Sequence, residues 1–136
     1  MLYMLDTDIC SYIMKKTPLS LLSLLQEKIE SGHSICISVI SYSELRLGAE
    51  RSSAANKYNR LINEFCERLD FIADWTTQEA DVFAKLQAGL FSKGLPIGYN
   101  DAMISAHALL LNAVLVTNNQ KHFSRVPELL VENWVQ

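Results

Sequence analysis

Apolar residues follow two patterns along the chain: short unbroken runs, and longer stretches in which they recur every three or four positions. The short runs predict buried strands, and the longer stretches predict helices with one buried face. Strands are expected at 2–5, 34–40, 71–75 and 113–117, with one more short strand within 128–135. Helices are expected at 19–30, 41–52, 54–69, 76–94 and 100–112, and another helical pattern runs from the first strand through Lys16.

Local signals mark the ends of several predicted helices. Pro18 stops the first helical pattern, Thr76 and Glu79 have capping-box spacing, and Gly94 follows the long helix that they begin. Strands that alternate with helices indicate a parallel sheet with helices on both faces. We therefore expect an α/β fold, a three-layer sandwich around a mostly parallel sheet of four to five strands.

Length and composition limit the kind of protein this is. The chain has 136 residues, of which 49% are hydrophobic and 20% charged, so it fits one compact domain spanning 1–136. No apolar stretch reaches the roughly 20 residues of a membrane span, and the N-terminus lacks a signal-peptide pattern, so a cytoplasmic protein without a membrane partner is expected. Cys10, Cys36 and Cys66 are expected to be free buried thiols.

The net charge limits how the protein could bind its partners. A net charge of −3 argues against a protein that holds nucleic acid by overall positive charge. Nucleic acid stays possible as a ligand, because a local basic patch or a bound cation can supply the attraction.

Acidic and polar side chains come directly after the predicted strands. Asp6 ends the first strand, Glu44 comes just after the second in the first turn of the next helix, and Thr117 and Asn119 follow the fourth. Asp101 stands in the first turn of a helix that is apolar almost all round. Active sites in open α/β sheets lie outside the carboxyl ends of the strands, so these side chains are candidates for one site.

Each acid also has a purely structural explanation. Glu44 has capping-box spacing with Ser41, Asp101 follows a possible cap in Asn100, and Asp8 could cap the helix it begins. Together, however, three acids at one edge of a sheet would repel one another and raise their pKa values unless a cation sat among them. Mg²⁺ or Mn²⁺ are the cations that carboxylate oxygens favour.

A carboxylate-bound Mg²⁺ can position a phosphate, lower the pKa of a bound water and stabilise the leaving oxygen of a phosphodiester. The sequence has no serine nucleophile elbow, Walker loop, dinucleotide glycine motif or His/Cys cluster with metal spacing that would favour other chemistry. His33 and His122 are expected on the surface and His107 in the packing, which disfavours a nuclease built on paired histidines. Metal-dependent hydrolysis is the favoured reaction.

Four segments resemble a known family in order and spacing: "YMLDTDI", "SVISYSELRLGAERS", "GLPIGYNDAMISAHAL" and "VLVTNNQKHFSRVPELLVENW". They are similar to the PIN-domain ribonucleases, most of all to the VapC toxins of bacterial VapBC toxin–antitoxin pairs. The similarity covers nearly the whole chain, and the segment around Asp101 is the most specific part of it. A PIN-like sandwich is the fold that the resemblance implies.

The resemblance implies a Mg²⁺-dependent endoribonuclease, with Mn²⁺ as a possible substitute and a structured RNA such as tRNA as substrate. It also implies a homodimer and a cognate VapB-like antitoxin, through which alone operator DNA is bound. By motif match, Asp6 and Asp101 would be metal ligands, Glu44 would complete the acidic cluster, and Thr117 and Asn119 would line the site.

Two positions depart from the family pattern. Many PIN domains carry a fourth acid where this chain has Asn119, so a second metal would be weakly held or would need the substrate phosphate. Position 8 is often asparagine in similar toxins, whereas Asp8 adds negative charge beside the metal.

Two alternative functions stay open at this point. The chain could keep the fold only to bind a partner, with the acids as helix caps. Alternatively, "DTD" and "VLVTNN" resemble the first two motifs of haloacid-dehalogenase-type phosphatases, although Glu128 and Glu132 are the only acids after Asn119. Within the nuclease interpretation, the helices at 19–30 and 54–69 are expected to supply the dimer or antitoxin surface.

Overall fold

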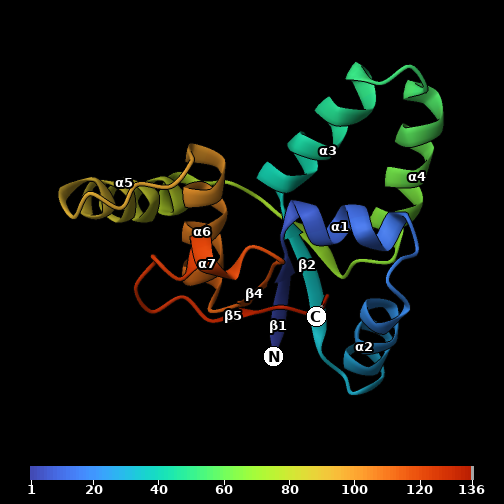
Figure 1. The fold of residues 1–136 in the computed structure, drawn as a ribbon, viewed down its shortest axis with the longest axis horizontal. Helices are drawn as coiled ribbons and strands as arrows, with labels where there is room; N and C mark the ends of the chain where they lie inside the picture. The colour runs from blue at the N-terminus through green and yellow to red at the C-terminus, as the bar shows by residue number, and fades with distance from the viewer. Residues whose placement is uncertain (136) are drawn as a thin grey trace.

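The computed structural model describes residues 1–135. The helices and strands follow in the order β1 (Leu2–Leu5), α1 (Thr7–Met14), α2 (Leu19–Glu30), β2 (Ser34–Ser38), α3 (Val39–Arg51), α4 (Ala55–Glu67), β3 (Phe71–Ala73), α5 (Thr77–Ser92), α6 (Tyr99–Leu111), β4 (Val114–Val116), α7 (Gln120–Phe123) and β5 (Val131–Glu132). The five strands form one sheet in the order β3-β2-β1-β4-β5, and every neighbouring pair is parallel (Figure 1). The predicted α/β class and strand number are confirmed.

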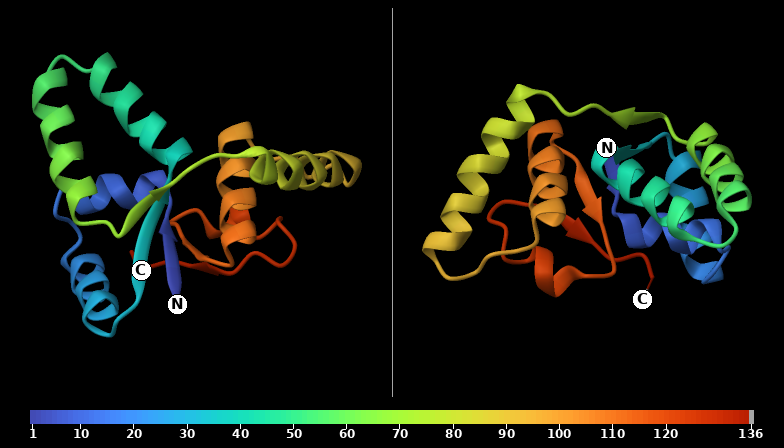
Figure 2. Two further views of the ribbon diagram at one scale, coloured as in Figure 1. Left: turned by 180° about the vertical axis from the view of Figure 1, so that it is seen from behind. Right: turned by 90° about the horizontal axis from the view of Figure 1, so that it is seen from above.

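Helices cover both faces of the sheet because successive strand residues point to opposite sides. Tyr3 and Leu5 of β1 pack into a core shared with helices α1 to α4, whereas Met4 packs on the other side, with Ile104 of α6. Figures 1 and 2 show these two groups of helices on opposite sides of the strands. The result is the expected three-layer arrangement.

The strand order places a topological switch point at β1. The chain proceeds from β1 to β2 on one side and later returns to add β4 on the other side. In open α/β sheets the crevice at such a point, outside the carboxyl ends of the strands, is where ligands bind. Asp6 follows β1 directly and Thr117 follows β4 directly, so both lie at this crevice.

The boundary between β2 and α3 differs from the prediction. The strand expected at 34–40 ends at Ser38, and α3 begins at Val39, because the Ser38 hydroxyl caps the helix by accepting a hydrogen bond from the Ile40 N–H at 3.0 Å. Glu44 therefore lies in the second turn of α3, not the first. The capping box expected between Ser41 and Glu44 is wrong for the same reason.

Other local predictions have mixed outcomes. The capping box of Thr76 and Glu79 is confirmed at the start of α5. Gly98, not Asn100, is the N-cap residue of α6, and the short helix α7 was not predicted. All three cysteines are free, with Cys66 only partly buried. Within residues 1–135, no helix has the length and apolar character that crossing a membrane requires.

Candidate active site

Asp6 is the most buried acid of the candidate site, with an exposed fraction of 6%. It is the N-cap of α1, and its Oδ1 accepts a hydrogen bond from the Thr7 N–H at 2.8 Å. Its Oδ2 accepts a second bond, also 2.8 Å long, from the hydroxyl of fully buried Thr117. These two bonds fix the plane of the Asp6 carboxylate at the carboxyl end of β1.

Thr117 joins the ends of two strands and the turn that follows. Its N–H donates to the Glu132 carbonyl at 2.9 Å, which places it beside β5, and its Oγ1 accepts from the Asn119 N–H at 3.0 Å. The Asn119 side chain is exposed, and among residues 1–135 its amide group makes no hydrogen bond. Asn119 therefore reaches the site through its backbone, and its side chain is free for a ligand.

Glu44 projects from α3 toward the start of α1. Its Oε1 lies 2.7 Å from the hydroxyl of Thr7, which in turn lies 3.0 Å from the hydroxyl of buried Ser41. Glu44 thus bonds across two helices and does not cap its own, so the structural explanation offered for it by the sequence is wrong. Thr7 and Ser41 were not predicted as site residues, because hydroxyl residues near helix starts usually serve as caps.

Asp101 projects from the first turn of α6, with 30% of its side chain exposed, and meets α7. Its Oδ2 lies 3.0 Å from Nδ1 of His122, whose side chain is 24% exposed. The expectation that His122 lies free on the surface is therefore wrong. No sequence pattern indicates this contact, since it depends on how a four-residue helix packs against α6.

Asp8 also lies at this edge of the sheet. Its Oδ1 accepts from the Ile9 N–H at 2.7 Å and its Oδ2 from the Asn118 N–H at 3.1 Å. Asp8 is thus held toward the turn after β4, and the cap of α1 is Asp6. The two carboxylates of the "DTD" segment consequently contact the same turn, through Thr117 and Asn118.

The pKa values of Asp6 and Asp101 are raised, in part because other carboxylates lie nearby. Burial, the charge of Asp8 and, to a smaller extent, the charge of Asp101 together raise the pKa of Asp6 from 3.8 to about 7, against the hydrogen bonds from Thr117 and Thr7 that lower it. Burial also raises the pKa of Asp101; His122 opposes this, while Glu44 and Asp8 add to it. Since like charges at close range disfavour the ionised form, the acids form one electrostatic cluster.

The chemistry of these donors fits a hard divalent cation. Carboxylate oxygens are the ligands such ions prefer, and a cation would relieve the repulsion that raises the pKa values of Asp6 and Asp101. The site is not preassembled, however: among residues 1–135, no three Asp, Glu, His or Cys side chains are positioned to hold one ion together. Glu44 is bonded to Thr7, and Asp101 is in contact with His122.

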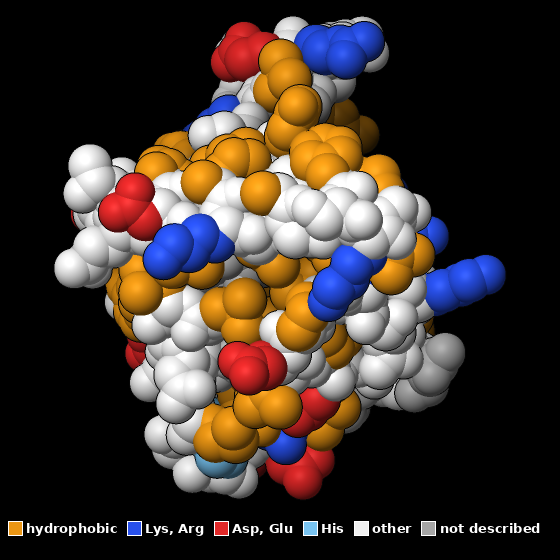
Figure 3. Space-filling view, turned by 90° about the vertical axis from the view of Figure 1, so that its left-hand side faces the viewer, with side chains coloured by type: hydrophobic (Ala, Val, Ile, Leu, Met, Phe, Trp, Pro, Cys, Tyr) orange, Lys and Arg blue, Asp and Glu red, His pale blue; other side chains and the backbone are white. Residues whose placement is uncertain are grey.

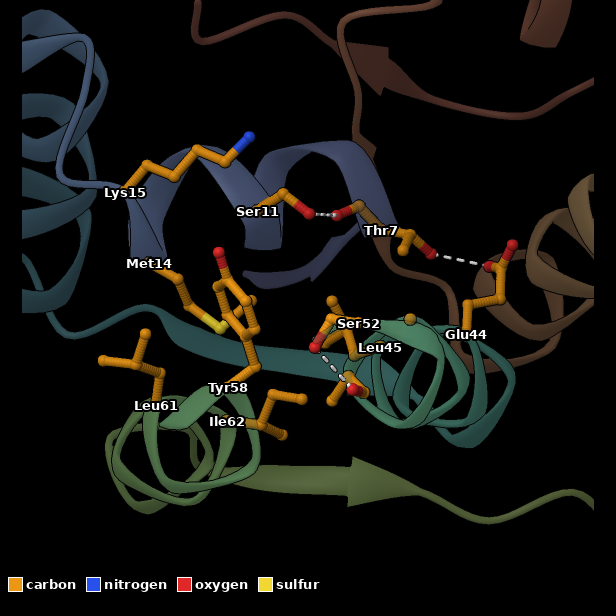
Figure 4. Close-up of a pocket in the computed structure, with 12 residues that line it drawn as sticks. Thr7, Ser11, Met14, Lys15, Glu44, Leu45, Ser52, Tyr58, Leu61 and Ile62 are labelled. Carbon is orange, nitrogen blue, oxygen red and sulfur yellow. Dashed lines mark hydrogen bonds between the residues drawn. The ribbon is translucent and has the colours of Figure 1, made fainter. Parts of the chain in front are cut away.

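A cleft of about 410 Å³ runs from the acids between α1, α3 and α4 (Figure 4). Thr7 and Glu44 lie at one end of this cleft, and Met14 and Leu61 lie toward the other. A smaller hollow shares Met14 and Leu61 and extends to Phe65. The cleft is lined by Thr7, Ser11, Met14, Lys15, Glu44, Leu45, Gly48, Ala49, Ser52, Tyr58, Leu61 and Ile62. Its walls are thus mainly apolar, with a carboxylate of the cluster at one end.

Comparison with known proteins agrees with this geometry. Residues 3–129 match the PIN domain. Ribonuclease VapC2 of Rickettsia felis is 40% identical over 134 residues, which is 98% of each chain. The tRNA(fMet)-specific endonuclease VapC of Salmonella typhimurium is 36% identical over 97% of each chain. The crystal structure of VapBC2 from Rickettsia felis bound to a promoter DNA fragment has a chain with a TM-score of 0.91 and 39% identity, which covers 98% of this chain and 99% of that one.

These matches extend over almost the whole chain and include both the sheet and the acids at its edge. Asp6, Glu44, Asp101 and Thr117 all lie within the matched range, as does Asn119. The protein belongs to the PIN-domain family and, within it, to the VapC ribonucleases.

Proposed function

We propose that this protein is the toxin of a VapBC-type toxin–antitoxin pair and that it hydrolyses phosphodiester bonds in RNA with the help of a divalent metal. The observation that carries the proposal is the electrostatic cluster at the switch point, in which Asp8 and Asp101 raise the pKa of Asp6 and in which Glu44 and Asp8 raise the pKa of Asp101. Acids that raise one another's pKa values in this way are typical of a functional site that binds a ligand.

Asp6, Asp101 and Glu44 would hold the metal, which we propose to be Mg²⁺ with Mn²⁺ as a substitute. When bound, such an ion supplies charge that lowers the pKa of water and stabilises the leaving oxygen of a phosphodiester. Carboxylates of this kind leave part of the ion's coordination to water and substrate phosphate.

The surrounding residues position the three acids. Thr117 donates to Asp6 Oδ2, and the Thr7 N–H holds Oδ1, so the Asp6 carboxylate has one orientation. The Thr7 hydroxyl holds Glu44 at the mouth of the cleft. The exposed amide of Asn119 lines the site and offers both a donor and an acceptor to a nucleotide.

Structured RNA is the proposed substrate, and tRNA is favoured within that class. The support is the similarity to VapC of Salmonella typhimurium, which is named a tRNA(fMet)-specific endonuclease. The net charge of −3 gives the chain no general attraction for polyanions, so recognition would depend on local contacts around the acids.

The cleft between α1, α3 and α4 is the proposed antitoxin site. Solved relatives are VapBC complexes, so the partner is a VapB-like protein, and operator DNA would be bound only through it. An apolar segment of the antitoxin in the cleft would end beside Glu44, so that binding would block the acids. The α4 segment predicted as a partner surface lines this cleft through Leu61 and Ile62.

A homodimer is also proposed, formed by the end of the molecule that carries α5 and the loop before α6. Phe91, Leu95 and Tyr99 are exposed there by 55%, 42% and 65%. Figure 3, a view from the left-hand side of Figure 1 where α5 projects, shows apolar side chains interspersed with Lys and Arg on this face. A sedimentation measurement showing a monomer at micromolar concentration would contradict the dimer.

The nuclease proposal is tested by cleavage of end-labelled tRNAs and ribosomal RNA fragments with Mg²⁺, with Mn²⁺ and with EDTA. Specific cuts that leave 5′-phosphates and disappear in EDTA, in Asp6→Ala and in Asp101→Ala are the expected result. Cleavage that persists in EDTA or in both variants would show that the acids are structural. Metal binding without cleavage of any RNA would favour a domain that only binds partners.

A further inference from the structure

A buried polar contact links the two helices that carry Glu44 and Asp101. Nδ1 of His107 in α6 lies 2.8 Å from Oγ of Ser38 at the end of β2, and both residues have an exposed fraction of 0%. Among residues 1–135, this is the one side-chain hydrogen bond that joins α6 to the β2–α3 junction. The cleavage mechanism proposed above does not use either residue.

The chemistry of both partners suits this hydrogen bond. Ser38 Oγ accepts from the Ile40 N–H at 3.0 Å and still has its own proton and a second lone pair for His107 Nδ1. Nε2 of His107 lies 3.7 Å from Oε1 of Glu79 and, among residues 1–135, makes no hydrogen bond. Burial lowers the pKa of His107 against the opposing effect of Glu79, which favours the neutral ring.

The contact joins the start of α3 to the middle of α6. Ser38 caps α3, in which Glu44 is the sixth residue, and His107 lies in the same helix as Asp101, six residues further along. A buried hydrogen bond between two side chains fixes the relative position of the elements that it joins more narrowly than apolar packing does. The contact therefore limits how far Asp101 can move relative to Glu44.

We infer that His107 is a positioning residue for the acidic cluster, holding α6 on Ser38 so that Asp101 stays within reach of Glu44 when a metal ion completes the site. This inference rests on the proposed nuclease function. It accounts for a polar pair at a place in the core that apolar side chains could fill.

The test compares His107→Leu and Ser38→Ala, which each remove the hydrogen bond, with His107→Asn, whose amide can occupy the place of Nδ1. Ile35→Val, a core change near the start of β2 and at the opposite end of the sheet from the acids, is the control for lost stability. Mn²⁺ affinity is measured by the electron paramagnetic resonance of free Mn²⁺, and kcat and KM are measured on an RNA that the wild-type protein cuts.

We expect about a tenfold weaker Mn²⁺ affinity in His107→Leu and Ser38→Ala. We also expect a lower kcat at nearly unchanged KM, because RNA binding surfaces are untouched. His107→Asn should recover most of both quantities, and Ile35→Val should keep wild-type values at a lowered melting temperature. Because Ser38→Ala also removes the cap of α3, Ser38→Gly, which keeps a residue tolerated as an N-cap, decides the question if His107→Leu does not fold.

Wild-type Mn²⁺ affinity and kcat in the folded variants that lack the hydrogen bond would overturn the positioning role, while leaving the nuclease proposal intact. Equal losses in Ile35→Val would also overturn it, because they would follow from stability alone. A wild-type protein that neither binds Mn²⁺ nor cuts RNA would instead refute the proposed function, and the positioning role with it.

Discussion

In the absence of metal, the replacement Asp6→Asn should raise the stability of the protein relative to wild type, and this difference should grow as the pH rises. The substitution keeps the size and shape of a carboxyl group that is 6% exposed, and it removes the ability to ionise. The wild-type carboxylate is destabilised in the folded state, mainly because it is buried and because Asp8 repels it. Functional groups that are held at a cost to stability are expected at active sites.

The magnitude follows from the pKa of Asp6. An acid with a pKa of 3.8 in the unfolded chain and about 7 in the folded protein binds its proton more tightly when folded. Stability is therefore lost as the pH rises from about 4 to about 7, and the loss amounts to roughly 4 kcal/mol when the group is fully ionised. At pH 5 the loss of stability is less than half of this amount.

Urea unfolding of both proteins in EDTA, from pH 5 to pH 8, measures this effect. The free energy of unfolding of Asp6→Asn relative to wild type should rise by about 2–3 kcal/mol over that range. An amide that fails to reproduce the hydrogen bonds with Thr7 and Thr117 would lower stability equally at every pH. The test is therefore how the difference in free energy of unfolding between variant and wild type changes with pH. A difference that does not change with pH would refute the conclusion that Asp6 is electrostatically destabilised.

Three further predictions test other parts of the site. Saturating Mg²⁺, at a hundred times its Kd, should stabilise the wild-type protein by about 2.7 kcal/mol in thermal melts; an equal effect in Asp101→Ala would contradict the ligand assignment. Thr7→Val removes the hydroxyl that holds Glu44 and should lower kcat about tenfold, which RNA cleavage rates measure, whereas an unchanged rate would contradict the positioning role of Thr7. Leu61→Glu in the cleft should abolish antitoxin binding in a pull-down assay, whereas the control Leu130→Glu, at an exposed position outside the cleft, should bind normally; retained binding by Leu61→Glu would exclude the cleft.

The arrangement of the strands and of the acids could be predicted because both depend on simple patterns. Apolar runs separated by helical stretches imply a parallel sheet, and residues that follow parallel strands come to the same edge of it. Asp6 and Thr117 follow β1 and β4 directly, so their contact across 2.8 Å required only that these strands be neighbours. Glu44 and Asp101 were candidates because they were expected in the first turns of helices at the same edge of the sheet, and the motif resemblance supported that choice.

The contacts that connect helices could not be predicted, because they depend on packing angles. Thr7 and Ser41 approach Glu44 only because α1 and α3 cross at the mouth of the cleft. His122 meets Asp101 because a short helix, absent from the predicted elements, turns toward α6. The start of α3 was misplaced because Val39 and Ile40, which have strong strand propensity, form its first turn behind the Ser38 cap.

The central claim is that the acid cluster hydrolyses RNA with a divalent metal, and Asp6→Asn tests it most directly, because the variant is expected to be the more stable protein. Wild type and Asp6→Asn are compared on the same end-labelled tRNA panel at pH 8 with Mg²⁺, after both are shown to be folded. The account predicts specific cleavage by wild type and none by the variant. Cleavage of the same bonds by the folded variant at the wild-type rate would contradict it.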